Sequence, residues 1–303
     1  MRAHDLSGAA FYPRGMPASP VTAPPLASEQ WRARAQEHEA RADALTAAHR
    51  ARASRAQRHP VEDFLFTYYS YKPSVLRRWH PGAGGVLADA PERREWRWYA
   101  ADGATGALVD AGRFRAERGS LYRGVVGLLR ATRDRAPVFG CFGLHEWAMV
   151  YRTDRPRHAE PLRLGAAGTD AVVEASELRC THFDAFRFFT DAAVPRNRRV
   201  LTRDDGIAFE QPGCLHAGMD VYKWAVKLGP LVPGEVLLDA FELARDIRTL
   251  DMRASPYDLS DWGYSPVKIE TVEGKAEYVR QQRALSDRSQ ALRGRILDAV
   301  AEG

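Results

Sequence analysis

The stretch DVYKWAVKLGPLVPGEVLLDAFELARDIRTLDM (residues 220–252) carries the strongest signal for the fold. In its second part, 235–252, apolar side chains recur three and four positions apart, the spacing of one face of an α-helix. The first part, 220–228, is also amphipathic, and a Pro-Gly pair stands between the two. Because proline and glycine interrupt helices, we expect two amphipathic helices joined by a short loop. The apolar residues of the second helix are Leu237, Phe241, Ala244, Ile247 and Leu250.

Other segments of the chain show the same kinds of periodicity. Residues 96–118 alternate around an Asp-Gly pair, which predicts a β-hairpin, and 176–189 has the aromatic content of a strand. The expected fold class is therefore mainly α with a small β component (α+β). Helical spacing recurs in four further segments, at 121–133, 141–151, 169–174 and 273–301.

The chain divides into three expected parts. Residues 1–27 are broken repeatedly by proline and glycine, which predicts a disordered leader. Residues 28–58 are rich in Ala, Arg and Glu with almost no apolar stripe, which predicts an exposed basic helix. Residues 59–303 form the expected single catalytic domain, helical apart from the hairpin and short strands. The basic edge of the exposed helix fits either a phosphate backbone or plain solvation, and it consists of Arg50, Arg52, Arg55 and Arg58.

Bulk composition excludes several classes of protein. No apolar run approaches the ~20 residues that cross a bilayer, so no membrane partner is expected. The leader lacks the apolar centre of a secretory signal, and the three cysteines form no CxxC pair, which favours a cytoplasmic location. The net charge of +5 comes almost entirely from arginine. This charge permits a DNA partner, although the arginine bias of a GC-rich genome would produce it as well.

Each of the three cysteines lies close to a histidine. A spacing of four residues shares a helix face, and a spacing of two shares a strand face. The sequence therefore permits a divalent metal, Fe, Mn or Zn, held by His145, His182 and His216. The cysteines also fit the core as small apolar groups, and neither a zinc-finger spacing nor HExxH is present. The pairs are Cys141 with His145, Cys180 with His182, and Cys214 with His216.

Carboxylates accompany the same histidines. Glu146 adjoins His145, and Asp184 is expected to share a strand face with His182. Asp220 lies one helical turn beyond the third histidine. Such pairs orient an imidazole or position a water, or else they satisfy one another as a buried polar network. The candidate catalytic residues are Asp184, Asp220, Glu146, His182 and His216.

Aromatic and basic side chains surround these positions in the sequence. The rings predict a flat pocket that would stack a purine and favour a cationic alkylated base, although an ordinary core would also use most of them. The loop at 194–203 is basic and precedes the third histidine, where it would suit phosphate. The candidate substrate-binding residues are Trp147, Phe188, Tyr68, Tyr69, Lys223, Arg196, Arg198 and Arg199.

The segment DMRASPYDL (251–259) is dense in charge at the end of a predicted helix. We interpret it first as structural, with Asp251 pairing with Arg253, and second as a substrate contact. Walker A, GxGxxG and GxSxG motifs are absent. P-loop nucleotide hydrolysis, Rossmann cofactor binding and serine-esterase chemistry therefore lose their usual support.

Four segments carry a family resemblance that extends from His59 to the end of the chain. They are HPVEDFLFTYYSYKPSVLRRWHPG (59–82), THFDAFRFF (181–189), GCLHAGMDVYKWAVKLGPLVP (213–233) and FELARDIRTLDMRASPYDL (241–259). In these segments the chain resembles a group of actinobacterial and proteobacterial proteins labelled 3-methyladenine DNA glycosylase. The resemblance implies hydrolysis of the N-glycosidic bond of an alkylated purine in DNA, without a cofactor. The LPGxG hairpin of helix-hairpin-helix glycosylases is not reproduced, because Val236 replaces its second glycine.

The sequence leaves three functions open. The leading hypothesis is a DNA glycosylase, in which Trp147 and Phe188 hold the flipped base and Asp184 or Asp220 assists bond cleavage. The second is a metal-dependent enzyme acting on a small molecule or a modified nucleotide, with the three histidines as ligands and a carboxylate completing the shell. The third is a non-catalytic nucleic-acid-binding protein, which rests on charge alone.

Overall fold

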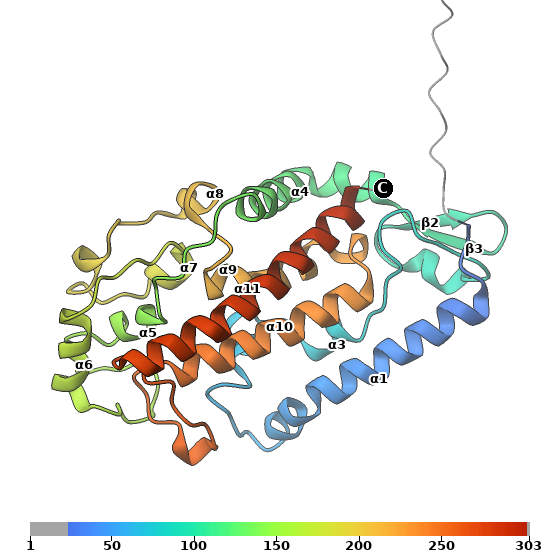
Figure 1. The fold of residues 1–303 in the computed structure, drawn as a ribbon. Helices are drawn as coiled ribbons and strands as arrows, with labels where there is room; N and C mark the ends of the chain where they lie inside the picture. Colours follow the sequence, from blue (N-terminus) through green and yellow to red (C-terminus); the bar gives the residue numbers. More distant parts are fainter. Residues whose placement is uncertain (1–23, 302–303) are drawn as a thin grey trace, which may run out of the picture.

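The chain is mainly helical. The computed structural model describes residues 24–301. Of the predicted leader at 1–27, residues 1–23 lie outside the described residues. Long helices cross the molecule, and a small sheet lies at one end of it (Figure 1). The expected α+β class is therefore confirmed. Within 24–301, no helix is both long enough and apolar enough to cross a membrane.

Two helices joined by a short turn form the centre of the fold. Helix α9 (Leu215–Leu228) leads through the 3₁₀ helix η4 (Gly229–Leu231) into α10 (Gly234–Arg253), as the amphipathic pattern predicts. The predicted terminal helix is also confirmed, as α11 (Val272–Ala301), which packs against both. Helices α10 and α11 run side by side along the molecule (Figure 1).

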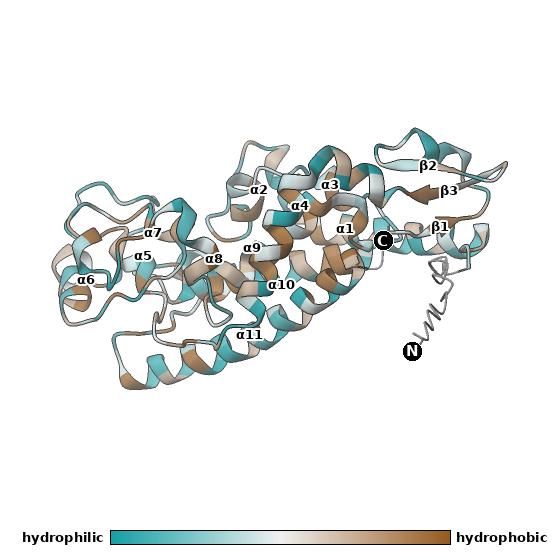
Figure 2. Ribbon diagram, turned by 90° about the horizontal axis from the view of Figure 1, so that it is seen from above, coloured by the Kyte–Doolittle hydropathy of each residue, from teal (hydrophilic) through white to brown (hydrophobic). Residues whose placement is uncertain are grey.

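The surfaces that α9 and α10 share are buried. All five apolar residues predicted for the core side of α10 are buried in the structure. A Cβ atom at Gly218 of α9 would lie 2.9 Å from Cδ1 of Ile247, so glycine permits the close approach of the two helices. Figure 2 shows hydrophobic colouring concentrated along α9 and α10, and hydrophilic residues along much of α11. The core is therefore built around the helix pair.

Helix α1 (Ser28–Ala53) has many exposed residues, as the sequence predicts, but one side of it is buried. Trp31 is buried and donates from Nε1 to the Ala88 carbonyl oxygen at 2.8 Å. His38 is also buried, and its Nε2 donates to the Leu76 carbonyl oxygen at 2.7 Å. The sequence does not reveal this buried side, because small and polar residues on it leave no apolar stripe. The buried side consists of Trp31, His38, Ala42 and Thr46.

The basic end of α1 also differs from the prediction. The helix ends at Ala53 instead of residue 58. Arg52 forms ion pairs with Glu62 at 2.7 Å and with Asp63 at 2.6 Å, so its charge is balanced within the chain. Arg50 pairs with an aspartate on its own helix. The edge expected to face phosphate therefore has fewer free charges than the sequence indicates.

A three-stranded antiparallel sheet precedes helix α4, in the order β1–β3–β2. The β2–β3 pair confirms the predicted hairpin, but α4 begins inside the range 96–118. It begins there because the Asp110 side chain accepts from the backbone N–H of Arg113 at 2.8 Å and caps the helix. Leu26 donates from its backbone N–H to Val86, which ties the end of the predicted leader to the sheet. The bounds are β1 (Val86–Leu87), β2 (Tyr99–Asp102), β3 (Gly106–Val109) and α4 (Ala111–Arg133).

The strand predicted at 176–189 is wrong. This segment contains a helical turn, α7 (Phe183–Phe186), and its one β-type contact among the described residues is an isolated bridge from Leu178 to Asn197. Within residues 24–301, no neighbouring strand lies beside it to form a ladder. Instead the Asn197 side chain accepts from the Cys180 N–H at 2.8 Å and donates to the Cys180 carbonyl oxygen at 3.1 Å. Aromatic content alone is therefore not sufficient to identify a strand.

Short helices make up most of the remaining structure. The helix predicted at 141–151 is reduced to α5, and the turn predicted at 169–174 is part of a longer α6. The α-helices are α2 (Phe64–Tyr68), α3 (Pro73–Leu76), α5 (Leu144–Ala148), α6 (Gly165–Glu174) and α8 (Gly206–Phe209). The other 3₁₀ helices are η1 (Pro91–Glu95), η2 (Val194–Arg196), η3 (Arg203–Asp205) and η5 (Ser260–Trp262).

Trp31→Ala tests the docking of α1. Because the indole is 2% exposed and hydrogen-bonded, its loss should lower the free energy of unfolding by about 3 kcal/mol. Urea unfolding followed by far-UV circular dichroism measures the change. Arg34→Ala, at an exposed position of the same helix, is the matched control and should leave the midpoint unchanged. Equal midpoints for the two variants would show that α1 does not contribute its packing to stability.

Candidate functional site

The three histidines singled out from the sequence come together in the interior. His145 lies on α5, His182 immediately precedes α7, and His216 lies in the first turn of α9. The ring centroids of His145 and His216 are 4.4 Å apart, and those of His182 and His216 are 5.5 Å apart. All three side chains are buried. The expected convergence of the three segments is therefore confirmed.

Helix α5 is held against the end of α10. Gly143, which precedes α5, has φ +72°, and a Cβ there would meet Tyr278 at 3.4 Å and Ala254 at 3.5 Å. Glycine thus satisfies both the left-handed backbone and the close packing. The indole Nε1 of Trp147 donates to the Ala254 carbonyl oxygen at 2.9 Å. These contacts fix the position of His145 on the same short helix.

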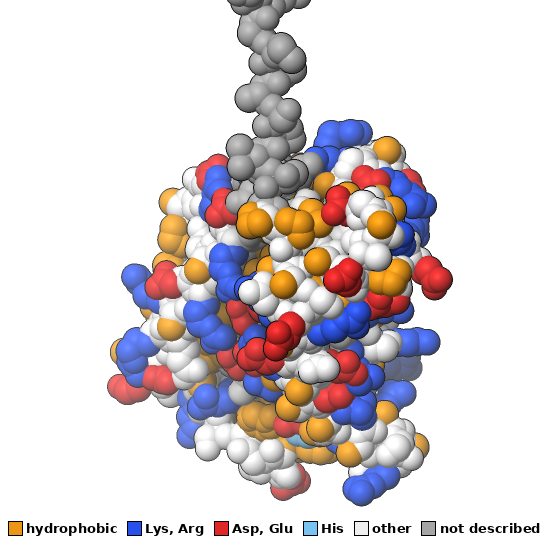
Figure 3. Space-filling view, turned by 90° about the vertical axis from the view of Figure 1, so that its right-hand side faces the viewer, with side chains coloured by type: hydrophobic (Ala, Val, Ile, Leu, Met, Phe, Trp, Pro, Cys, Tyr) orange, Lys and Arg blue, Asp and Glu red, His pale blue; other side chains and the backbone are white. Residues whose placement is uncertain are grey.

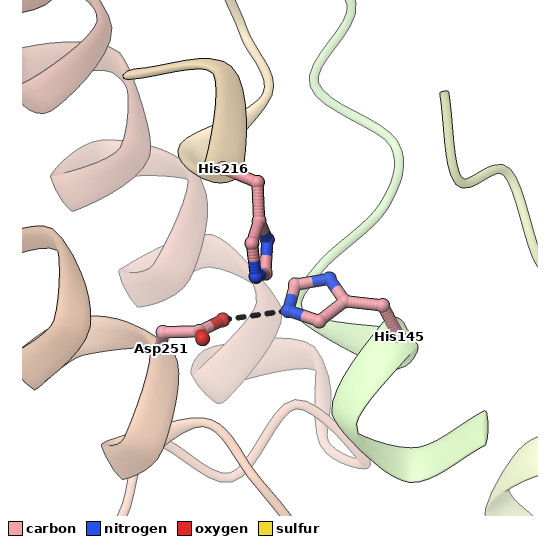
Figure 4. Close-up of side chains that lie close together, drawn as sticks. All are labelled: His145, His216 and Asp251. Carbon is pink, nitrogen blue, oxygen red and sulfur yellow. Dashed lines mark hydrogen bonds and ion pairs between the residues drawn. The ribbon is translucent and has the colours of Figure 1, made fainter. Parts of the chain in front are cut away.

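His145, His216 and Asp251 form a compact group of potential metal ligands. A ring nitrogen of each histidine and a carboxylate oxygen of Asp251 all lie within 4.8 Å of one another. The Nε2 of His145 lies 2.8 Å from Oδ1 of Asp251, and His216 approaches both from α9 (Figure 4). The Nδ1 atom of His216 is buried and has no hydrogen-bond partner in the described structure. We call these three residues the triad.

A buried arginine completes the surroundings of the triad. Arg248 donates from one guanidinium nitrogen to Oε1 of Glu146 at 3.0 Å and to Oδ2 of Asp251 at 3.1 Å. Its guanidinium carbon lies 3.8 Å from the centroid of the Phe64 ring. One cation therefore contacts two buried carboxylates, and it leaves Oδ1 of Asp251 directed toward the histidines.

Burial and neighbouring charge have opposite effects on the pKa of Asp251 and of His145, and both lower the pKa of His216. Burial raises the pKa of Asp251, but the neighbouring His145 charge and hydrogen bond outweigh burial and hold that pKa below its usual range. Burial lowers the pKa of His145, but Asp251 outweighs it and raises that pKa well above the usual value. Burial and then the charge of His145 lower the pKa of His216. A neutral imidazole at His216 has a free lone pair, as a metal ligand requires, whereas His145 must lose the proton that Asp251 stabilises before its Nε2 can bind a metal.

His182 belongs to a second, adjacent cluster. Its Nε2 lies 3.4 Å from Oδ2 of Asp220 and 3.6 Å from Oε1 of Glu210. Asp220 also accepts from the Tyr69 hydroxyl at 2.7 Å and from Lys223 Nζ at 2.7 Å. His182 was expected among the metal ligands, but Asp251 takes its place in the compact group with His145 and His216.

The predicted carboxylates have different environments. Glu146 and Asp220 are buried in the two clusters described above. Asp184 does not share a strand face with His182, because it lies on α7 and its side chain is partly exposed. Its oxygens contact Lys223 at 3.2 Å and Arg187 at 3.3 Å. Asp184 therefore lies at the edge of the site.

A cavity leads from the surface to the triad. An inner hollow of about 100 Å³ is lined by His216, Glu146 and Arg248, together with Phe64 and Phe188. It continues into an outer hollow of about 510 Å³, since six residues line both. The shared residues are Phe64, Tyr68, Arg157, His158, Asp184 and Phe188.

Several predicted substrate-binding residues lie on this cavity and others do not. Tyr68, Phe188, Tyr69 and Lys223 line it. Trp147 is fully buried and does not line it, so it cannot stack a base there. Arg196 donates to backbone carbonyls of α6. Arg198 and Arg199 line a separate hollow of about 290 Å³.

The three cysteines are unpaired, and none belongs to the triad. Cys141 Sγ lies 3.6 Å from Nδ1 of His145, on the side of the ring opposite Asp251. Burial raises the pKa of the Cys214 thiol to about 12, which disfavours the thiolate needed for ligation. Cys180 is buried beside the backbone of His182. The cysteine–histidine spacing therefore marked the right region but supplied no ligand to the group.

Two residues of the site, Arg248 and Glu210, were not predicted from the sequence. Asp251 was predicted to have a different partner. Asp251 bonds to His145 and Arg248, whereas Arg253 donates to the Ser265 carbonyl oxygen, so the predicted Asp251–Arg253 pair is wrong. A signal was present, because 248 and 251 continue the three- and four-residue spacing of the apolar face of α10. Charged residues at such positions indicate a buried polar network. Glu210 has no comparable signal.

Comparisons of the chain with protein-family profiles, with curated proteins and with solved structures find no match. What the site does must therefore follow from its own geometry and chemistry.

Arg248→Leu tests the buried network. Removal of the guanidinium leaves Glu146 a buried carboxylate without a cation and leaves Asp251 with His145 alone, so the free energy of unfolding should fall by about 3 kcal/mol. Urea denaturation provides the measurement. Arg245→Leu, an exposed position one helical turn earlier, should change it little. If both substitutions had equal effects, the network would not be a source of stability.

Proposed function

We propose that this chain is a metal-dependent enzyme that acts on a small molecule, with His145, His216 and Asp251 as the metal ligands. The observation that carries the proposal is the placement of two imidazoles and one carboxylate within 4.8 Å of one another. All three residues are buried, and one of them, His216, lines the inner hollow. The group thus combines a ligand set with a route for substrate.

The ligand set limits the choice of metal. Two histidines and one carboxylate suit Fe(II), Mn(II) or Zn(II), and three protein ligands leave coordination positions free for water or substrate. A metal held there would act as a Lewis acid or lower the pKa of a bound water. Arg248 would orient Asp251 through its second oxygen, and Cys141 would support the far nitrogen of His145.

A proton acceptor is also available beside the ligands. Glu146 lines the inner hollow, and one of its oxygens is held by Arg248. A carboxylate fixed in this way is suited to accept a proton from a water or substrate group in the hollow. The three unpaired cysteines fit the reducing cytoplasm, which is where we place this activity.

Metal content tests the proposal. Untagged protein purified without chelators should contain about one equivalent of Fe, Mn or Zn, measured by inductively coupled plasma mass spectrometry. His145→Ala, His216→Ala and Asp251→Asn should each lower metal content roughly tenfold, because each removes a ligand. Wild-type protein that remains metal-free after growth with added iron, manganese and zinc would overturn the proposal.

Two control variants sharpen this measurement. His182→Asn should keep the metal, because its nearest charged neighbours are Glu210 and Asp220 instead of the triad. His59→Ala lies outside both clusters and should also keep it. Loss of metal in His182→Asn with a folded circular dichroism spectrum would assign the ligands to the three histidines instead.

A DNA glycosylase is a second proposal, supported by the aromatic lining of the cavity. Phe64, Tyr68 and Phe188 surround the route to the triad, and Asp184 stands beside them. Such walls suit a flipped base. Trp147 and the predicted phosphate-binding loop do not contribute, which weakens this proposal. On the face shown in Figure 3, positive and negative side chains are interspersed, so that face offers no basic stripe for the non-catalytic nucleic-acid-binding alternative.

Release of 3-methyladenine from methylated DNA tests the glycosylase directly. Under this proposal Asp184→Asn should reduce release about a hundredfold, because the carboxylate would assist the reaction. Asp191→Asn, at an exposed position without an ion pair in the described structure, should retain full release. Liquid chromatography of the freed base is the assay, and no release by wild-type protein would remove the proposal.

A further inference from the structure

The route to the triad is lined by positive charge that the fold does not use. Four basic residues line the outer hollow, against one carboxylate. Arg187 and Lys223 both contact that carboxylate, Asp184. Arg157 and Lys227 form no ion pair with any residue in 24–301. The outer hollow therefore has a surplus of cations, two of which are free to bind an anion from solution.

Two of these cations are held in position by one aromatic ring. The guanidinium carbon of Arg157 lies 3.9 Å from the centroid of Phe188, and that of Arg187 lies 4.3 Å from the same centroid. Stacking on a ring restricts a long side chain before any ligand arrives, which lowers the entropy lost on binding. Guanidinium groups bind carboxylate and phosphate through paired N–H donors.

Another part of the lining is aromatic. Phe64 and Tyr68 are stacked, with their ring centroids 5.0 Å apart and an angle of 11° between their planes. Both line the inner and the outer hollow. Because the Arg248 guanidinium already lies 3.8 Å from the centroid of the Phe64 ring, a planar ring of a ligand would stack on Tyr68. The outer hollow, at about 510 Å³, is within the size range of small-molecule sites, whereas the inner one, at about 100 Å³, admits only a narrow group.

We infer that the substrate is a small organic anion with a planar ring and a phosphate or carboxylate group. Its anionic group binds Arg157 and Lys227 in the outer hollow, and its other end points into the inner hollow toward His216. The assignment of His216 as the reactive end rests on the metal site proposed above. The anion site itself does not, because it is built from the protein's own cations.

Calorimetric titration with phenyl phosphate and with benzoate tests the inference and separates the two anionic groups. At least one should bind, and phenol, the neutral analogue, should not bind measurably. Arg157→Gln and Lys227→Gln should each weaken binding about tenfold, or about 1.4 kcal/mol. Arg155→Gln is the matched control, since this exposed arginine lies in the same loop but lines neither hollow. Equal binding by all three variants, or by phenol, would overturn the inference.

The titration is repeated with metal-loaded protein and with protein stripped by EDTA and dialysed. Anion binding that survives without metal supports the inference even if the metal proposal fails. Metal content near one equivalent with no anion binding would overturn the inference alone. A short single-stranded oligonucleotide that binds more tightly than phenyl phosphate and depends on Arg157 would show that the partner is nucleic acid, which also overturns it.

Discussion

The pairing of one buried guanidinium with two buried carboxylates is the constraint on which the site depends. Arg248, Glu146 and Asp251 are nearly inaccessible to solvent, and a charge in such surroundings is tolerated only when it is paired. The pairing joins α5 to α10, so it also fixes the two triad residues that these helices carry. The same contact that satisfies the electrostatics of the core thus sets the geometry of the ligand group.

Periodicity was sufficient to predict the long helices, and it failed where packing does not follow apolarity. Helices α9, α10 and α11 lie where their spacing places them. The buried side of helix α1 was not predicted because it includes His38, Ala42 and Thr46, which no hydrophobicity pattern distinguishes from a solvated side. The segment 176–189 was misjudged because a strand needs a partner, and a single sequence does not show whether one is available.

The site was predictable in location but not in composition. Cysteine–histidine spacing marked three segments, and their imidazoles do meet. Spacing along the chain says nothing about which carboxylate approaches from another helix, so Asp251 was assigned to a local pair and Glu210 was not considered. The basic loop at 194–203 shows the reverse error, because nearness in sequence to His216 did not place Arg198 and Arg199 on the same cavity.

The triad also has a consequence for the order in which the chain folds. The helical hairpin of α9 and α10 closes through a five-residue connection, at low cost in chain entropy. The contact between His145 and Asp251 joins residues 106 positions apart, so it has a high contact order. Contact order therefore favours helix pairing before ligand assembly, and a nascent chain that has left the ribosome only as far as α9 has no complete site. The two histidines of the triad precede Asp251 in the chain, so the ligand group is complete only after Asp251 has been synthesised.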